Sequence, residues 1–281
     1  MPAAPSDASA PAPDASGARA ARRRLRTLAV CAAPVVALLA VAVLAPLPFT
    51  IAQPSATVNV LGVDKGQPVI TIQGTPTRGT SGQLRMTAIG ATGPDVEVRL
   101  ADVVSGWFRT DRAVMPHDAV YPAGKSDQEI EQHNLSDMKK SQDAATQAAL
   151  ALLHRSPGDV KVGLRLADIG GPSAGLLFAL GIVDKLDGDG RGGDLTGGRT
   201  IAGTGTIEPD GTVGPVGGVS LKMQAAHRDG ATVFLVPKEE CSDATGELPK
   251  GLRLIPVTNL KGAVGALKDL SAGRPVPSCS S

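Results

Sequence analysis

The fold is decided by residues 160–183, which read VKVGLRLADIGGPSAGLLFALGIV. Apolar and polar residues alternate over 160–166, a pattern that predicts a β-strand with one buried face. Pro172 fits the first turn of a helix, because its missing N–H group would be unsatisfied there anyway, and the apolar run 174–183 continues that helix. The stretch therefore predicts a strand, a glycine turn and a helix, with Ser173 in the first helical turn.

Ser173 is the first candidate for a nucleophile. A serine at the second position of a helix lies among unsatisfied backbone N–H groups at the positive end of the helix dipole, where an oxyanion is stabilised. Gly170 and Gly171 precede it and allow a substrate to approach the backbone closely. A serine that only helps to start a helix has the same pattern, so both interpretations stay open on pattern alone.

Residues 171–175 (GPSAG) also match the nucleophile elbow of α/β-hydrolases, a fold that needs a later Asp and then a His. His227 follows in that order. However, only about two elements separate it from Ser173, and the alternating strands and helices of such a fold are missing. An esterase that depends on His227 is therefore the weaker alternative.

Lys222 is the first candidate for a general base. It lies in the predicted helix 219–228, at the edge of an apolar stripe formed by Val219, Met223 and Ala226. A lysine can replace histidine as a base if burial or neighbouring charges lower its pKa from about 10.4 toward roughly 7–8. The competing interpretation is that Lys222 is an ordinary surface lysine, which packs its aliphatic stem on the helix and keeps its ammonium group in water.

Several ordered segments together resemble the proteolytic domain of Lon proteases, namely 168–175 (DIGGPSAG), 202–207 (AGTGTI), 211–218, 222–228 and 233–237. The resemblance implies an α+β Lon-type fold and a Ser–Lys dyad, which falls on Ser173 and Lys222. It also implies that Thr204 lies beside the lysine, and that backbone N–H groups near Gly170 and Ser173 form the oxyanion hole.

The resemblance extends more weakly upstream, to 81–87 and 140–150. The second of these segments lies in a predicted helix over 126–154, which begins with a capping box of Ser126 and Glu129. We therefore expect 54–155 to form the N-terminal part of a Lon-like domain, 156–272 its catalytic core, and 273–281 a C-terminal tail.

The N-terminal segment predicts a membrane anchor. Residues 1–26 are rich in Ala, Pro, Ser and Asp and end in an arginine cluster, which predicts a disordered cytoplasmic tail. The uncharged run that follows reaches Gln53, so 27–50 is expected to span the cell membrane once as a helix, with the catalytic domain extracytoplasmic. A cleaved signal peptide is the alternative.

This layout resembles the bacterial membrane-bound Lon-like proteases that carry a PDZ module. Here the chain departs from that pattern, since there is no room for the module between Leu153 and Val160. Cys241 and Cys279 both fall on the expected outer side, where disulfides persist. Their even number and common location predict a bridge between them.

The composition of the chain limits which partners and cofactors can be expected. A net charge of +1 and an aromatic content of four Phe, one Tyr and one Trp give no basis for nucleic-acid binding. The histidines are scattered and the cysteines lack metal-ligand spacing, so we expect no metal and no cofactor. The resemblance to the Lon proteolytic domain, without an ATPase module, implies an ATP-independent serine endopeptidase acting on unfolded or flexible protein segments. A non-catalytic membrane scaffold with the same fold is a further alternative.

Overall fold

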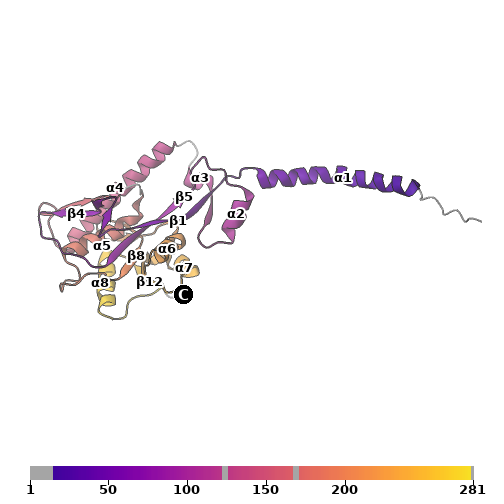
Figure 1. Cartoon of the computed structure of the whole chain (residues 1–281). Helices are drawn as coiled ribbons and strands as arrows, with labels where there is room; N and C mark the ends of the chain where they lie inside the picture. The colour runs from indigo at the N-terminus through magenta and orange to yellow at the C-terminus, as the bar shows by residue number, and fades with distance from the viewer. Residues whose placement is uncertain (1–14, 122–125, 167–170, 280–281) are drawn as a thin grey trace, which may run out of the picture. The chain divides into compact units, whose positions relative to one another are not determined.

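A computed structural model describes residues 15–121, 126–166 and 171–279 (Figure 1). The chain divides into two compact units. The N-terminal unit contains the residues up to Leu47 together with 99–101, and the main domain contains 48–98 and the residues from Asp102 onward.

The N-terminal unit consists mainly of helix α1, Ala15–Leu44. Its part Arg23–Leu44 is long and apolar enough to cross a membrane, a property that fits either a membrane span or a signal sequence. Two expected boundaries need correction. The helix already includes 15–26, which were expected to be a disordered tail, while 1–14 lie outside the described residues.

The expected anchor 27–50 is also too long at its C-terminal end. The helix ends at Leu44, and Phe49 and Thr50 open the first strand of the main domain, where Thr50 is buried. Pro46 and Pro48 explain the change, because proline cannot continue a helix and restricts the residue before it to extended backbone. An apolar run alone does not distinguish a buried strand from a span.

The main domain is a mixed α+β structure built on one six-stranded sheet with the order β12-β11-β8-β5-β1-β6. The first four strands in that order are parallel to one another, and β1 is antiparallel to both of its neighbours. The strands are β1 Phe49–Asn59, β5 Gln83–Ala91, β6 Ala113–Pro116, β8 Thr200–Gly203, β11 Val233–Pro237 and β12 Arg253–Val257. Segments 54–155 and 156–272 therefore share one sheet.

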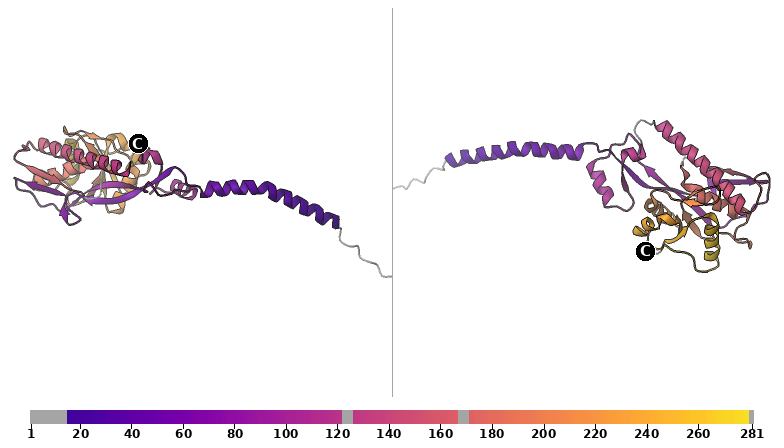
Figure 2. Two further views of the ribbon diagram at one scale, coloured as in Figure 1. Left: turned by 90° about the horizontal axis from the view of Figure 1, so that it is seen from above. Right: turned by 180° about the vertical axis from the view of Figure 1, so that it is seen from behind.

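The two longest strands, β1 and β5, run side by side in Figures 1 and 2. Their register joins Ala52 to Ala91 at one end and Asn59 to Arg85 at the other, with an irregularity between Pro54 and Thr57. Because proline has no N–H group to donate to the ladder, a bulge at Pro54 is its ordinary place in a strand.

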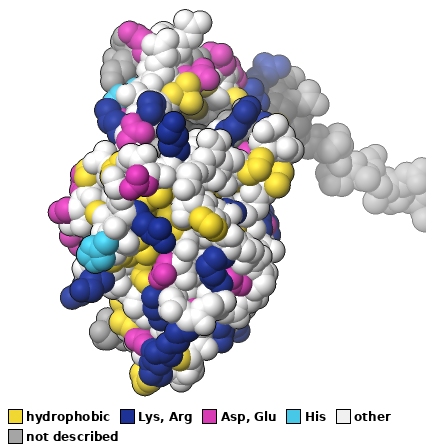
Figure 3. Space-filling view, turned by 90° about the vertical axis from the view of Figure 1, so that its left-hand side faces the viewer, with side chains coloured by type: hydrophobic (Ala, Val, Ile, Leu, Met, Phe, Trp, Pro, Cys, Tyr) yellow, Lys and Arg dark blue, Asp and Glu magenta, His cyan; other side chains and the backbone are white. Residues whose placement is uncertain are grey.

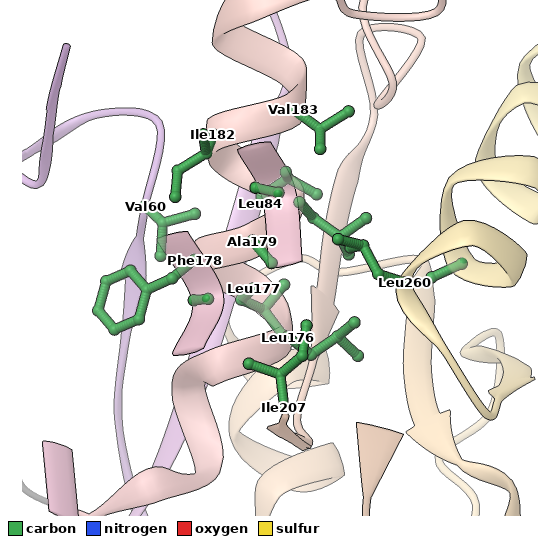
Figure 4. Packing of buried hydrophobic residues seen from close by; sticks show 14 of the residues in the cluster. Val60, Leu84, Leu176, Leu177, Phe178, Ala179, Ile182, Val183, Ile207 and Leu260 are labelled. Carbon is green, nitrogen blue, oxygen red and sulfur yellow. The ribbon is translucent and has the colours of Figure 1, made fainter. Parts of the chain in front are cut away.

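Helices α4 (Asp127–Leu152) and α5 (Gly175–Leu186) pack against each other. The predicted capping box is confirmed, since the Ser126 side chain accepts from the Glu129 N–H and the Glu129 carboxylate accepts from the Ser126 N–H. Nearly every residue of α5 is buried, and its aliphatic side chains lie among those of the sheet and of α8, Leu260–Ser271 (Figure 4).

The remaining elements are shorter. The predicted strand 160–166 is confirmed as β7, Lys161–Leu164, which pairs with β4, Ile70–Gln73, outside the main sheet. Residues 153–160 join α4 to β7 in a hydrogen-bonded turn, which leaves no PDZ module at this position. The others are α2 Leu100–Trp107, α3 His117–Val120, α6 Val219–Arg228, α7 Cys241–Gly246, and the short pairs β2 (Val63–Asp64) with β3 (Gln67–Pro68) and β9 (Thr206–Ile207) with β10 (Val213–Gly214).

The C-terminal segment is joined to α7 by a disulfide between Cys241 and Cys279, whose Cα atoms lie 5.4 Å apart. The predicted bridge is therefore present, and it attaches the C-terminal tail to the main domain through Cys279. Charged side chains of both signs are interspersed over the face of the molecule shown in Figure 3, in keeping with the near-zero net charge.

Candidate active site

The turn that carries Ser173 lies at the start of α5. Pro172–Ala174 form one 3-10 turn before the helix, and Gly171 caps it with a φ of +91°, a left-handed conformation that favours glycine. Ser173 is half-buried and stands where the sequence predicted, in the first helical turn. Gly170, expected to contribute to the oxyanion hole, lies outside the described residues.

Helix α4 holds this turn in place. The Ser141 hydroxyl donates a hydrogen bond of 2.9 Å to the carbonyl oxygen of Pro172, and the Gly171 N–H donates to the carbonyl oxygen of Asn134. Gly175 permits the close approach, because a Cβ atom there would lie 2.7 Å from both the Ser141 Oγ and the Ile207 Cγ2. A side chain at this position would push the turn away from α4.

Thr204 connects the serine turn to the candidate base. Its hydroxyl donates to the carbonyl oxygen of Ser173 at 3.2 Å and accepts from the Lys222 Nζ at 3.2 Å. The Gly205 N–H donates to the same Ser173 carbonyl at 3.0 Å. Thr204 is fully buried and Lys222 is 3% exposed. The structure thus brings together the three residues that sequence motifs had selected from three separate segments.

The position of Lys222 changes its acid–base behaviour. Helix α6 begins after Gly218, whose left-handed backbone turns the chain into the helix, and it places Lys222 on its buried side. Burial lowers the pKa of the ammonium group to about 8, and the negative charge of Glu240 opposes this by raising the pKa. A larger fraction of this lysine is neutral near pH 7 than of an ordinary lysine, so it can accept a proton.

Ser173 and Lys222 line the same cleft, whose volume is about 420 Å³. The other lining residues are mainly apolar and come from β5, α4, the serine turn, β9 and the loop before α6, namely Met86, Ala88, Ile89, Met138, Gly171, Pro172, Ala174, Thr206, Pro215, Val216 and Gly217. His227, the base that the esterase alternative requires, is exposed on α6 and does not line this cleft. The geometry therefore favours the lysine.

Three contributors were missed by the sequence analysis. Ser141 and Asn134 hold the serine turn, and Glu240 lies near enough to Lys222 to affect its charge. Ser141 left a weak signal as a polar residue on the otherwise apolar face of a predicted helix. Asn134 acts only through its backbone carbonyl, and Glu240 follows a strand without any motif, so neither had a detectable pattern.

The turn of Ser173 is thus joined through the buried Thr204 to the buried Lys222. Residues 166–265 match the family model described as the Lon protease (S16) C-terminal proteolytic domain. Ser173, Thr204 and Lys222 all lie within that segment. The resemblance to the Lon proteolytic domain is confirmed, and this family implies a serine peptidase.

Individual relatives agree with the family model. The Lon protease of Chloroflexus aggregans is 37% identical over 93 residues, which cover 32% of this chain and 10% of the relative. The Lon protease of Clostridioides difficile is 41% identical over 83 residues, 30% of this chain and 10% of the relative. That of Methanosarcina barkeri is 31% identical over 109 residues, 38% and 13% respectively. The chain thus spans about a tenth of the length of these relatives.

Proposed function

We propose that this chain is an ATP-independent serine endopeptidase in which Ser173 is the nucleophile and Lys222 the general base. The observation that carries the proposal is the buried Lys222 ammonium group, bonded through Thr204 to the turn of Ser173 and lining the same cleft. A buried cation with a lowered pKa costs stability, and such an arrangement is typical of a site that moves protons.

In the proposed reaction, the Ser173 Oγ attacks the carbonyl carbon of a peptide bond while Lys222 accepts the hydroxyl proton. The negative charge that develops on the carbonyl oxygen is stabilised by backbone N–H groups at the start of α5. Lys222 then gives the proton to the leaving amine, and an acyl-enzyme remains on Ser173. A water molecule, deprotonated by the same lysine, completes the hydrolysis.

The proposed substrates are unfolded chains or flexible segments of proteins. The cleft is lined by apolar side chains and backbone rather than by a charged binding surface. A peptide segment must be extended to bring one carbonyl carbon next to Ser173, so a folded protein would have to expose such a segment first. We further propose that α1 is a single-pass membrane anchor that places the main domain outside the cytoplasm.

The test compares variants of the full chain on an unstructured fluorogenic peptide. Ser173→Ala and Lys222→Ala should each lower kcat by at least about 10²- to 10⁴-fold, and the double variant should be no worse than either single one, because the two residues act as a unit. Lys222→Arg should also be inactive, since a guanidinium group stays protonated. The matched control is Lys238→Arg at an exposed position close by, which should keep wild-type activity.

Two outcomes would overturn the proposal. If Lys222→Ala is active and His227→Ala is not, the esterase mechanism holds instead. If no peptide is cleaved, and neither Ser173 nor any other serine reacts with a fluorophosphonate, the chain is a scaffold with a peptidase fold. Reaction at Ser173 that is lost in Lys222→Ala would support the dyad.

A further inference from the structure

Helix α2 presents an apolar face to solvent in the main domain (labelled in Figure 1). Val104, Trp107 and Phe108 are 40%, 75% and 85% exposed. Residues three positions apart lie on the same side of a helix, so Val104 and Trp107 share one side of α2, and Phe108 is the first residue after the helix. Trp107 is the single tryptophan of the chain and Phe108 one of only four phenylalanines. Exposure of both at adjacent positions leaves a concentrated apolar patch.

The opposite side of α2 fixes this orientation. Val103 is 4% exposed, and Gly106 is buried against β6, where a Cβ atom would lie 2.6 Å from the Val114 Cγ2. The glycine thus allows the helix to pack closely on the strand through its other face. Because that contact involves the buried face, Trp107 and Phe108 cannot turn inward without losing it.

The covalent chain connects this patch to the membrane span that we propose. Strand β6 pairs with the first residues of β1, in the register Phe49 with Pro116 and Ala52 with Ala113. The candidate span ends at Leu44, and the short segment from Leu44 to Phe49 can extend over at most about 18 Å. The segment from Trp107 to Ala113 reaches at most about 21 Å. Both connecting segments end on the pair formed by β1 and β6.

We propose that the apolar patch formed by Val104 and Trp107 of α2 and by the adjoining Phe108 docks on the outer surface of the lipid bilayer. This rests on the proposed membrane anchoring by α1. Tryptophan and phenylalanine are the side chains that favour the boundary between lipid headgroups and acyl chains. The neighbouring Arg109 and Asp111 form an exposed ion pair with each other. Docking should therefore depend on apolar burial and only weakly on salt or on anionic lipid.

A second copy of the chain fits this patch less well. Three side chains with these exposed fractions offer at most about 400 Å². A stable interface between two proteins needs about 800 Å² from each partner. An interfacial helix has no such minimum area, since the proposed anchor keeps it within reach of the bilayer and a few aromatic side chains are sufficient to orient it.

Because Trp107 is the only tryptophan, its fluorescence reports on this site alone. The full chain is reconstituted in phosphatidylcholine liposomes, with and without bromine on the acyl chains, and flotation after carbonate treatment first measures anchoring. We expect brominated lipid to quench most of the Trp107 emission and acrylamide to quench it several-fold less than free tryptophan. Phe108→Asp should weaken the quenching by brominated lipid.

The matched control moves the tryptophan to the other end of the sheet. In Trp107→Phe combined with Val63→Trp, the probe stands at a position that is 65% exposed in wild type and lies beyond the far end of β1. That strand is about 35 Å long. Emission from this position should be insensitive to brominated lipid and open to acrylamide.

Three results would overturn the docking proposal. Trp107 emission that is open to acrylamide in floated liposomes means a free patch, and emission shielded from acrylamide but insensitive to brominated lipid means that a protein surface covers it. In both cases the anchor stands and only the docking fails. A chain that does not float, and whose emission brominated lipid leaves unchanged, refutes the anchor and the docking together.

Discussion

Lys222 has a pKa that burial lowers to about 8 and that Glu240 partly restores. Replacing Glu240 by Gln should remove that charge while an amide oxygen remains to accept the hydrogen bond from the Val216 N–H. The pKa of Lys222 should then fall further, because the cation loses its neighbouring anion. In the rate profile for peptide cleavage, kcat/KM of the wild type should rise through about pH 8, and the profile of Glu240→Gln should rise at lower pH.

The control for this pH profile is Glu239→Gln, at the exposed neighbouring position, which should leave the profile unchanged. An inflection that stays where it was in Glu240→Gln would show that the lysine is not the group that titrates. An inflection near the ordinary lysine value of about 10.4 would show that burial does not lower its pKa in solution.

Thr204 is expected to orient the lysine rather than to react. Thr204→Val keeps the shape of the buried side chain but removes both the acceptor for the Lys222 Nζ and the donor to the Ser173 carbonyl. We expect kcat to fall by about 10²-fold with little change in KM. Thr204→Ser keeps the hydroxyl and should recover most of the rate. Equal losses in the two variants would assign Thr204 a packing role only.

At the residue scale, motif recognition selected Ser173, Thr204 and Lys222 as candidates, because each has a fixed place in a local pattern of glycines and apolar residues, and the structure brings the three together. It did not locate Ser141 or Asn134, whose contacts exist only after α4 has packed against the serine turn. Contacts between elements distant in the chain depend on the tertiary fold, and a single sequence carries no direct record of them.

The element that supports Ser173 also contains a buried charge. Asp184 on α5 is fully buried; its Oδ1 accepts from the Leu195 N–H at 2.7 Å, and its Oδ2 has no hydrogen-bond partner among the described residues. Burial raises the pKa of this carboxyl group to about 6, and the hydrogen bond from the Leu195 N–H opposes the shift more than the charge of Arg78 does. The charged form is therefore disfavoured in the folded state.

This carboxyl group should make stability depend on pH. Between about pH 4 and 6 the folded state binds more protons at Asp184 than the unfolded state does, so its contribution to the free energy of unfolding falls as pH rises and is lowest above pH 6. Asp184→Asn should remove that slope and raise stability at pH 7 by up to about 3 kcal/mol. Denaturant unfolding from pH 4 to 8 measures it, with the exposed Asp187→Asn as control. If Asp184→Asn is less stable than the wild type at pH 7, the predicted direction of this effect is wrong.

The elements were predicted well where one periodicity ran without interruption. The helices at 126–154 and 219–228 and the strand at 160–166 follow their patterns closely. Strand β12 left no usable pattern, because it is short and contains Pro256, a residue that argues against a strand; it is an edge strand, where proline is tolerated. The pairing of β7 with β4 rather than with the main sheet could not be predicted either, because the alternation of apolar residues indicates which face of a strand is buried but not which strand it pairs with.

At the scale of the whole molecule, the bridge between Cys241 and Cys279 closes the C-terminal part of the main domain. The positions are 38 residues apart, and closing a loop of this size in the unfolded chain contributes roughly 3–4 kcal/mol. Replacing both cysteines by serine should lower the free energy of unfolding by about that amount. Chemical unfolding measures the change, and peptide mapping without reductant checks the bond itself; two free thiols in the native protein would refute it.

The organisation of the N-terminal segment was predicted only in outline. Composition identified an apolar helix but placed its end within β1, since hydropathy treats a buried strand and a span alike. The two prolines between Leu44 and Phe49 were the available signal. The single sheet that joins 54–155 with 156–272 could be expected only through the family resemblance, because its parallel pairings connect strands far apart in the chain.

The orientation that we propose for the chain in the membrane rests on charge. Four arginines lie between positions 22 and 26, just before the apolar part of α1, and basic residues stay on the cytoplasmic side. We therefore expect a C-terminal reporter that works only outside the cytoplasm to be active, and one that works only inside to be silent. The chain contains an independent check, because a disulfide between Cys241 and Cys279 persists only in an oxidising compartment. Replacing the arginines of this cluster by glutamate should reduce the signal of the outside reporter and leave both thiols free in the misoriented fraction.

An intact N-terminus, measured by mass spectrometry of the membrane fraction, distinguishes an anchor from a cleaved signal sequence. An active inside reporter together with free thiols in the unaltered chain would refute the orientation, whereas a processed N-terminus would refute the anchor but not the outside location.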